Sequence, residues 1–271
     1  MGAGTATAFE RATAVAPLGD GAFRASCDDD WSAGRGPNGG YLAAIVLRAM
    51  LAEVADGARH ARSITCHYLR PPRDGEVRVD VAVERAGRSV STLGARLSQD
   101  GALCVLAVAA FARDLDGALD YGAQAPEAPD PRSVPAAAPV PDVPMTARFN
   151  ARPTLGALPF SGAGEALTGG WLRFAEPQAL DAPALAMYAD AWVPSPFPRL
   201  TGYAWAPTID LTVLFRAPAA TAAVAPDEPI FAVFSSASAS GGFFDEDAEL
   251  WSRDGVLLAR SRQHALLVDG R

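Results

Sequence analysis

The chain of 271 residues has 49% hydrophobic and 20% charged side chains, a composition typical of a globular protein with one large domain or two ordinary ones. Its net charge of −8 argues against nucleic acid as a partner, because neutralising phosphates requires a basic surface. The sequence has no lysine, which excludes a Walker A phosphate loop, a Schiff-base lysine and a pyridoxal site.

The N-terminal segment, residues 1–21, is rich in alanine but lacks a basic stretch followed by a continuous apolar one. It does not have the pattern of a secretory signal peptide. No apolar run in the chain reaches the roughly 20 residues that a bilayer-spanning helix needs. We expect a cytoplasmic protein with no membrane span.

The first half is predicted to contain one buried helix, at residues 40–55. Apolar side chains recur at helical spacing from Leu42 to Met50, and Leu47 and Leu51 extend the apolar surface around the helix. A helix that is hydrophobic nearly all round belongs in an interior. Four strand-like runs follow it, separated by turns suited to hairpins: residues 63–69, 76–85, 89–98 and 102–112.

The segment from Gly34 to Gly40 formally matches the glycine pattern of dinucleotide-binding folds. That fold also needs an apolar strand before the glycines, but residues 26–31 are polar, and no parallel βαβ alternation appears. Two readings remain. Gly39 and Gly40 open the helix either as a tight turn or as a pair of exposed amides that bind an oxyanion.

A linker is predicted at residues 120–144, which are dense in Pro and Ala and lack apolar periodicity. We expect it to be extended and weakly structured. It divides the chain into an N-terminal unit, residues 1–119, and a C-terminal unit, residues 145–271.

The second half repeats the order of the first. A helix is predicted from Asp181, a plausible N-cap followed by Pro183, to Trp192. Strands are predicted at residues 207–215, 229–236, 242–252 and 256–268. Each half therefore reads as a central helix followed by an antiparallel meander, which predicts an α+β fold. A buried helix wrapped by a curled antiparallel sheet is the hotdog architecture, and two tandem copies make a double hotdog.

Local motifs also recur between the halves. Arg70 followed by two prolines matches Arg216 followed by Ala and Pro, and the turn at Asp100-Gly101 matches the one at Asp254-Gly255. The interval between these landmarks is longer in the second copy, where residues 219–227, rich in Ala and Pro, form an insertion in a loop. This pattern indicates a duplication.

Three polar residues distinguish the second copy. Gln263 alternates with small and apolar residues on the last strand, so we expect it to be buried and hydrogen-bonded. Asp190 lies near the C-terminal end of an apolar helix, where the helix dipole disfavours a carboxylate. Simple pleating puts Thr208 on the polar face unless a bulge re-aims it. Periodicity leaves structural and functional roles open for all three.

Other chemistries fit the sequence poorly. Ser161 lacks the glycine that precedes the nucleophile of serine hydrolases by two residues. The three histidines, His60, His67 and His264, and the three cysteines, Cys27, Cys66 and Cys104, do not have the spacing of metal ligands.

The sequence resembles the type II acyl-CoA thioesterase family, whose members are double hotdogs. The resemblance extends from about Trp31 to Leu267, with the linker unmatched, and it rests on these strings: Gly39-Gly40, His67-Tyr68-Leu69-Arg70-Pro71, Tyr188-Ala189-Asp190, Pro207-Thr208-Ile209-Asp210, Phe215-Arg216, and Asp254-Gly255-Val256-Leu257-Leu258-Ala259 leading to Gln263. This chain has Pro37-Asn38 where the best-known members carry a histidine before the glycines.

The resemblance implies hydrolysis of an acyl-CoA to a free acid and CoA, with no cofactor and no metal. In the family an Asp, a Thr and a Gln hold the attacking water, and these fall on Asp190, Thr208 and Gln263. Amides of Gly39 and Gly40 are expected to contact the substrate oxyanion. Counting back from the repeat landmarks places Ala44, Arg62 and Ala109 at the corresponding positions of the first copy, which predicts a single site built from both halves.

Two alternative functions remain in view. One is a non-catalytic acyl-CoA-binding hotdog protein. The other is a hotdog hydratase or dehydratase, but that chemistry usually needs an Asp–His pair, and no histidine is suitably placed near Asp190. The expected partner is the acyl-CoA substrate, and a homodimer of double hotdogs is a further expectation.

Overall fold

The structure of the protein is a computed structural model that describes residues 6–270. Residues 1–5, where the N-terminal segment considered above begins, and Arg271 lie outside the described residues. The α-helices are α1 (Ala8–Ala12), α2 (Gly39–Val54), α3 (Ala182–Tyr188) and α4 (Pro218–Ala223). Short 3₁₀ helices lie at Asp29–Trp31, Pro131–Ser133, Pro144–Arg148 and Phe197–Arg199.

The strands of the N-terminal half are β1 (Ala16–Gly19), β2 (Ala22–Cys27), β3 (His60–Tyr68), β4 (Gly75–Ala86), β5 (Val90–Gln99) and β6 (Ala102–Ala112). Those of the C-terminal half are β7 (Phe149–Leu155), β8 (Leu167–Phe174), β9 (Ala204–Trp205), β10 (Thr208–Phe215), β11 (Ile230–Ser235), β12 (Ala239–Ser240), β13 (Phe243–Trp251), β14 (Leu257–Leu266) and β15 (Val268–Asp269). All eight predicted strands are present, and β1, β2, β7 and β8, which precede the two central helices, were missed.

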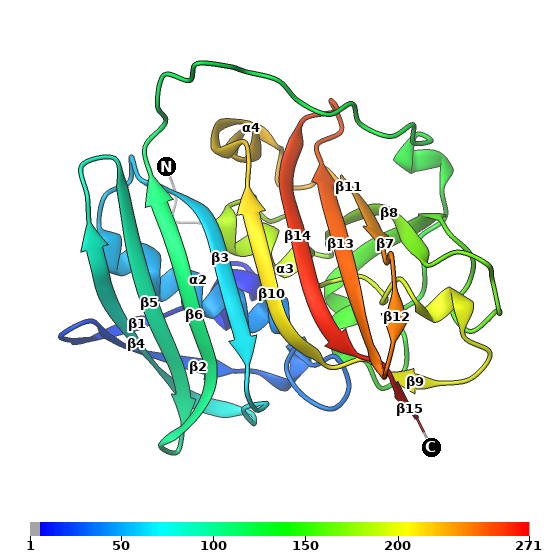
Figure 1. Ribbon diagram of the computed structural model, residues 1–271, viewed down its shortest axis with the longest axis horizontal. Helices are drawn as coiled ribbons and strands as arrows, with labels where there is room; N and C mark the ends of the chain where they lie inside the picture. Colours follow the sequence, from blue (N-terminus) through cyan, green and yellow to red (C-terminus); the bar gives the residue numbers. More distant parts are fainter. Residues whose placement is uncertain (1–5, 271) are drawn as a thin grey trace.

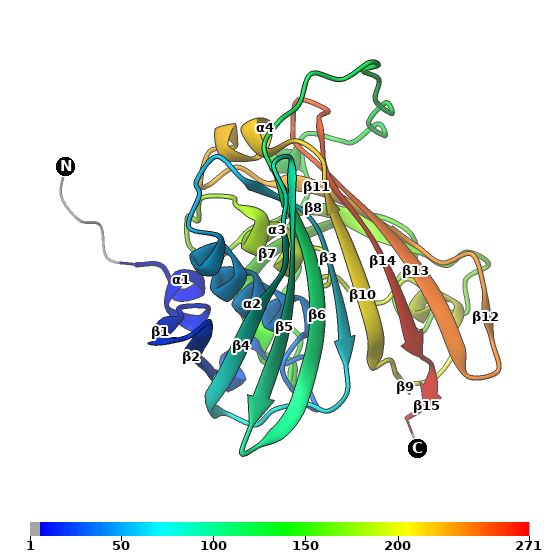
Figure 2. The same cartoon turned by 60° about the vertical axis from the view of Figure 1, so that its left-hand side comes forward.

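One antiparallel sheet runs through both halves, with α2 and α3 packed on the same face of it (Figures 1 and 2). Its strand order is β1-β2-β4-β5-β6-β3-β10-β14-β13-β11-β8-β7, with β12 paired to β13, and β9 and β15 form a separate small sheet. Among the described residues every strand pair is antiparallel, which agrees with the rejection of a dinucleotide-binding fold.

The predicted simple meander is wrong at one connection in each half. Strand β3 pairs with β6 instead of β4, and β10 pairs with β14 instead of β11. After β3 the chain reaches Pro71 and Pro72, and prolines cannot donate the hydrogen bonds of a tight hairpin ladder. The chain therefore crosses over before β4, β5 and β6 form consecutive hairpins.

The two halves join at β3 and β10, where Thr65 pairs with Thr212 and their hydroxyl oxygens lie 2.9 Å apart. The strands β6-β5-β4-β2 on one side of this junction repeat the order β14-β13-β11-β8 on the other. The prediction of an α+β double hotdog is thus confirmed.

The two central helices pack against each other and against the curled sheet, which buries them. In α2 ten residues are buried, as expected for a helix that is apolar nearly all round: Gly40, Tyr41, Leu42, Ala43, Ala44, Ile45, Val46, Leu47, Ala49 and Met50. Asp181 caps α3 as predicted, but the helix ends at Tyr188 instead of Trp192. The helix thus ends before Pro194 and Pro196, and Asp190 lies just beyond its end.

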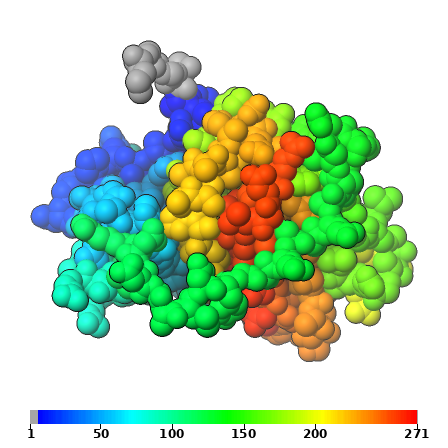
Figure 3. Space-filling model, turned by 90° about the horizontal axis from the view of Figure 1, so that it is seen from above, coloured from blue at the N-terminus to red at the C-terminus, as the bar shows by residue number. Residues whose placement is uncertain are grey.

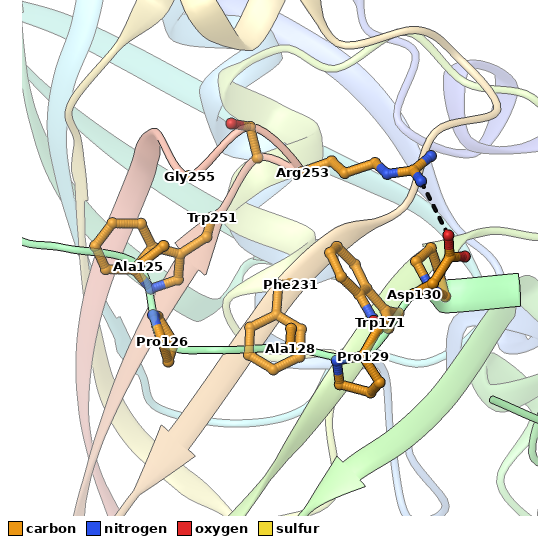
Figure 4. A pocket seen from close by; sticks show the side chains of 12 residues that line it. Ala125, Pro126, Ala128, Pro129, Asp130, Trp171, Phe231, Trp251, Arg253 and Gly255 are labelled. Atoms are coloured by element: carbon orange, nitrogen blue, oxygen red, sulfur yellow. Dashed lines mark hydrogen bonds and ion pairs between the residues drawn. The ribbon is translucent and has the colours of Figure 1, made fainter. Parts of the chain in front are cut away.

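The linker is extended, as predicted, but it is anchored to the outside of the C-terminal half (Figure 3). The indole N–H of Trp171 donates to the carbonyl oxygen of Pro129 at 2.7 Å, and Arg152 donates to the carbonyl oxygen of Pro131 at 3.0 Å. Between the linker and the aromatic rings of Trp171, Phe231 and Trp251 lies a cavity of about 200 Å³ (Figure 4). Apart from the 3₁₀ helix at Pro131–Ser133 and the start of the one at Pro144–Arg148, the linker has no regular secondary structure, as expected, but aromatic side chains on the outer face of the sheet hold it.

Candidate active site

Asp190 lies where the end of α3 meets the beginning of α2. Its Oδ2 accepts hydrogen bonds from the backbone N–H of Gly40 at 3.0 Å and from the side-chain amide of Asn38 at 2.9 Å. The N-terminus of a helix carries partial positive charge and unpaired N–H groups, so it suits a carboxylate. The unfavourable end of α3 is thus compensated by the favourable end of α2.

Asn38 performs two tasks at this junction. Its Oδ1 caps α2 by accepting from the N–H of Tyr41 at 3.0 Å, and its Nδ2 also donates to the backbone oxygen of Asp190 at 2.7 Å. From the neighbouring strand the hydroxyl of Tyr68 donates to the carbonyl oxygen of Gly39 at 2.8 Å. The carboxylate of the C-terminal half is therefore held by groups of the N-terminal half.

Thr208 and Gln263 meet on the inner face of the sheet. The hydroxyl of Thr208 donates to Oε1 of Gln263 at 2.8 Å. The pairing of β10 with β14 shifts register between Thr208 and Asp210, which is the bulge that simple pleating left undecided. Gln263 is 6% exposed, so the expectation that it is buried is confirmed.

A fourth polar residue, Glu246, was missed by the sequence analysis. It is 3% exposed and lies directly opposite Gln263 in the register of β13 and β14. The Nε2 of Gln263 donates to Glu246 at 2.6 Å, and the backbone N–H of Ser195 donates to its other oxygen. Glu246 alternates with the buried Phe244 and Ala248, so the strand-face argument applied to Gln263 would have found it.

The carboxyl groups of the half-buried Asp190 and the buried Glu246 hold protons more tightly than usual. Burial raises the pKa of Asp190 to about 6, although hydrogen bonds from Gly40, Gly39, Gln263 and Asn38 favour its charged form. Burial likewise raises the pKa of Glu246 to about 7, and repulsion from Asp190 adds to this rise. Carboxyl groups whose pKa is raised close to neutral pH in this way are typical of catalytic sites.

Each half of the chain matches a model of a known protein domain. Residues 27–112 match the acyl-CoA thioesterase N-terminal domain, and residues 123–267 match the acyl-CoA thioesterase C-terminal domain. The chain belongs to the acyl-CoA thioesterase family. Comparison with curated proteins gave no match.

Solved structures of acyl-CoA thioesterases and related proteins share the fold over the whole chain. A conserved protein of unknown function with a hot dog fold from Alicyclobacillus acidocaldarius is 27% identical, with a TM-score of 0.91, and the match covers 98% of this chain and 100% of that one. A putative thioesterase II from Thermobifida fusca is also 27% identical, with a TM-score of 0.83 and 100% of both chains covered. The acyl-CoA thioesterase II TesB2 of Mycobacterium marinum is 21% identical, with a TM-score of 0.77, and 96% of this chain and 98% of that one are covered.

Within this member of the acyl-CoA thioesterase family, the first copy lacks the polar groups of the second. The register confirms that Gln263 corresponds to Ala109, because these residues pair with Leu211 and Ile64 at matching points of β10 and β3. Thr208 corresponds to Ala61 instead of Arg62, since each comes just before the bulge of its strand. The count from the landmarks was off by one because Arg216 directly follows Phe215, whereas Leu69 separates Arg70 from Tyr68, the counterpart of Phe215.

The structure also corrects the prediction that Ala44 is the counterpart of Asp190, because Arg48 lies at the equivalent helix junction. Asp181 caps α3 as Asn38 caps α2, and its Oδ2 lies 2.7 Å from Nη1 of Arg48 near the far end of α2. At this equivalent junction an ion pair between Arg48 of the first copy and Asp181 of the second takes the place of the contact between Asp190 and Asn38. Ala44, the position predicted by counting, is fully buried within α2.

Gly39 and Gly40 contact Asp190 in this structure. The N–H of Gly40 is used by the carboxylate, and Gly39 also contributes a backbone hydrogen bond that favours its charged form. Contact of these amides with a substrate oxyanion stays a prediction. Of the helices between residues 6 and 270, none has the length and apolar character that a bilayer crossing requires.

Replacing Asn38 with serine is expected to keep the N-cap of α2 and to remove the hydrogen bonds to Asp190. Serine also caps helices well, so the free energy of unfolding should fall only through the lost hydrogen bonds to Asp190, by about 1–2 kcal/mol. Its short side chain cannot reach Asp190, and loss of that hydrogen bond raises the pKa of the carboxyl group further. The acid limb of kcat/KM should move to higher pH, which pH–rate profiles would measure. An acid limb at the same pH as in the wild type would contradict the role of Asn38 in holding Asp190. The control Asn38→Ala also removes the cap of α2 and should lose about 1 kcal/mol more in the free energy of unfolding.

Proposed function

We propose that this protein hydrolyses an acyl-CoA thioester to a free acid and CoA, using water activated by Asp190. The observation that carries the proposal is the Asp190 carboxyl group, held across the two halves beside Gln263 with a pKa of about 6. A general base works best when its pKa lies near the working pH. Membership of the acyl-CoA thioesterase family supports the choice of substrate.

The proposed mechanism needs no protein nucleophile. A thioester is already activated and thiolate is a good leaving group. Asp190 takes a proton as the water oxygen attacks the carbonyl carbon, the carbon–sulfur bond breaks, and the proton passes to the departing thiolate. Thr208 and Gln263 fix the position of the water, which lowers the entropic part of the barrier.

The hydratase alternative is disfavoured by where the histidines lie. His67 and His264 are exposed on the outer face of the sheet, and the ring of His264 stacks on Phe243. His60 begins β3, at the end opposite Tyr68. None of these three side chains is a hydrogen-bond partner of Asp190 within residues 6–270. A cytoplasmic location and pairing of two double hotdogs stay predictions.

The direct test is release of CoA thiol from a panel of acyl-CoAs with straight, branched and aromatic acyl groups. We expect turnover of at least one class, with a preference that identifies the acyl group. Saturable binding across the panel without any thiol release would instead support the acyl-CoA-binding alternative.

Thr208→Val tests the proposed positioning of water. Valine has nearly the same shape but cannot hydrogen-bond, so the water loses one of its contacts. With the preferred acyl-CoA, kcat should fall about 10–100-fold while KM stays nearly constant. Thr212→Val is the matched control, because its hydroxyl contacts Thr65 at the junction of the halves. Equal losses in the two variants would show that the effect is not specific to the site.

A further inference from the structure

Glu246 is a buried carboxyl group that the proposed mechanism does not use. Its two oxygens are accounted for by Gln263 and by the backbone N–H of Ser195. We propose that Glu246 is a positioning residue, which fixes the direction of the hydrogen bonds through Gln263 and Thr208 and thereby orients the attacking water. This inference rests on the thioesterase activity proposed above.

The argument begins with what each group can donate. Above pH 7 or so Glu246 is ionised and only accepts hydrogen bonds, so the amide nitrogen of Gln263 must then face it. The amide oxygen of Gln263 then faces Thr208 and accepts its hydroxyl proton. The second N–H of the amide favours the charged form of Asp190. Glu246 thus sets the orientation of an amide that could otherwise rotate by half a turn.

The consequence reaches the water through Thr208. Since its hydroxyl proton is used by Gln263, the oxygen of Thr208 can only accept a hydrogen bond from a neighbouring water. A water that donates one proton to Thr208 and the other to the Asp190 carboxylate keeps its lone pairs free for attack. With the amide of Gln263 reversed, Thr208 would donate to the water and compete for those lone pairs.

The fold itself does not require a carboxyl group at this position. The corresponding residue of the first copy is Leu93, which pairs with Ala109 as Glu246 pairs with Gln263. Leu93 is 1% exposed, so an apolar side chain fits the same place in the architecture. Burying a carboxyl group beside a second one costs free energy, as its raised pKa reflects. A role in the site accounts for this cost.

Glu246→Gln is the first test, because it keeps the shape and allows the hydrogen-bond direction to reverse. We expect kcat for the preferred acyl-CoA to fall about 10–100-fold with KM within about twofold. Glu246→Leu places the residue of the first copy in the second and should give a similar loss in a folded protein. Thr168→Val is the matched control, since it removes another buried hydrogen bond to the segment after α3 and should leave kcat unchanged.

A double-mutant cycle with Thr208→Val distinguishes positioning from a structural role. If Glu246 acts through Thr208, Glu246→Gln should lower kcat less than about twofold in the Thr208→Val background. Independent multiplication of the two losses, or a wild-type kcat for Glu246→Gln, would overturn the inference. If the wild type turns over the substrate and Asp190→Asn does not, such a result leaves the proposed function intact. Absence of turnover in the wild type would overturn both.

Discussion

Replacing Asp190 with asparagine is expected to lower kcat for acyl-CoA hydrolysis about 10²–10⁴-fold, the usual contribution of a general base. Asparagine has the same shape and can still accept hydrogen bonds from Asn38 and Gly40 at one atom, but it cannot take a proton from water. KM should change little, because the loss lies in the chemical step.

The same substitution should stabilise the protein at alkaline pH. The pKa of Asp190 is raised from 3.8 to about 6, so the folded state bears the cost of the buried charge above about pH 6 and loses that cost as pH falls toward 4. The rise corresponds to at most about 3 kcal/mol. Because the new amide group faces other donors, we expect a net gain of about 1 kcal/mol at pH 8 that disappears near pH 4.

Two measurements check this prediction: thiol release under saturating substrate, and urea unfolding at pH 8 and pH 4. Asp181→Asn is the matched control, because Asp181 is the equivalent capping position at the other helix junction. Asparagine caps helices as well as aspartate does, so this variant should keep its kcat and lose at most about 1 kcal/mol with the Arg48 ion pair. Wild-type turnover in Asp190→Asn would refute the proposed mechanism.

The elements of this fold could be predicted from local patterns, but their pairing could not. Periodicity indicated α2 and the eight longer strands after the two helices, since burial imposes a face on each element. It carries no information on which strand lies beside which, so the crossovers after β3 and β10 were missed. The repeated order of a helix followed by strands predicted the double hotdog, but only the structure shows the crossovers.

The candidate site, too, could be predicted only in part from local sequence patterns. The buried face of Gln263 could be read from alternation, and alternation would also have found Glu246. Thr208 could not be placed, because a bulge shifts the register by one residue and reverses the face. The clamp between Asn38 and Asp190 joins residues 152 positions apart, a contact that no local pattern encodes.

The glycine that opens α2 shows how closely packing and the site depend on each other. A Cβ atom at Gly40 would lie 2.6 Å from the carbonyl oxygen of Ala186, 2.9 Å from that of Met187 and 3.0 Å from Cβ of Asp190. The first two neighbours are backbone atoms of α3 and cannot rotate away. Any larger side chain must therefore push the two central helices apart at the point where the N–H of Gly40 meets the Asp190 carboxylate.

We accordingly expect Gly40→Ala to lower the free energy of unfolding by about 2–3 kcal/mol, as overpacking does in other cores. The melting temperature should fall by roughly 5–10 °C. If the protein hydrolyses acyl-CoA as proposed, the folded fraction should lose about 10²-fold in kcat, because the carboxylate is displaced from its donors. Gly57→Ala is the control, since a Cβ atom there meets nothing within 4 Å and stability should change by less than about 0.5 kcal/mol. Thermal melts with thiol-release assays on the folded fraction measure both effects, and a Gly40→Ala variant as stable and active as Gly57→Ala would show that α2 and α3 are not in contact as described.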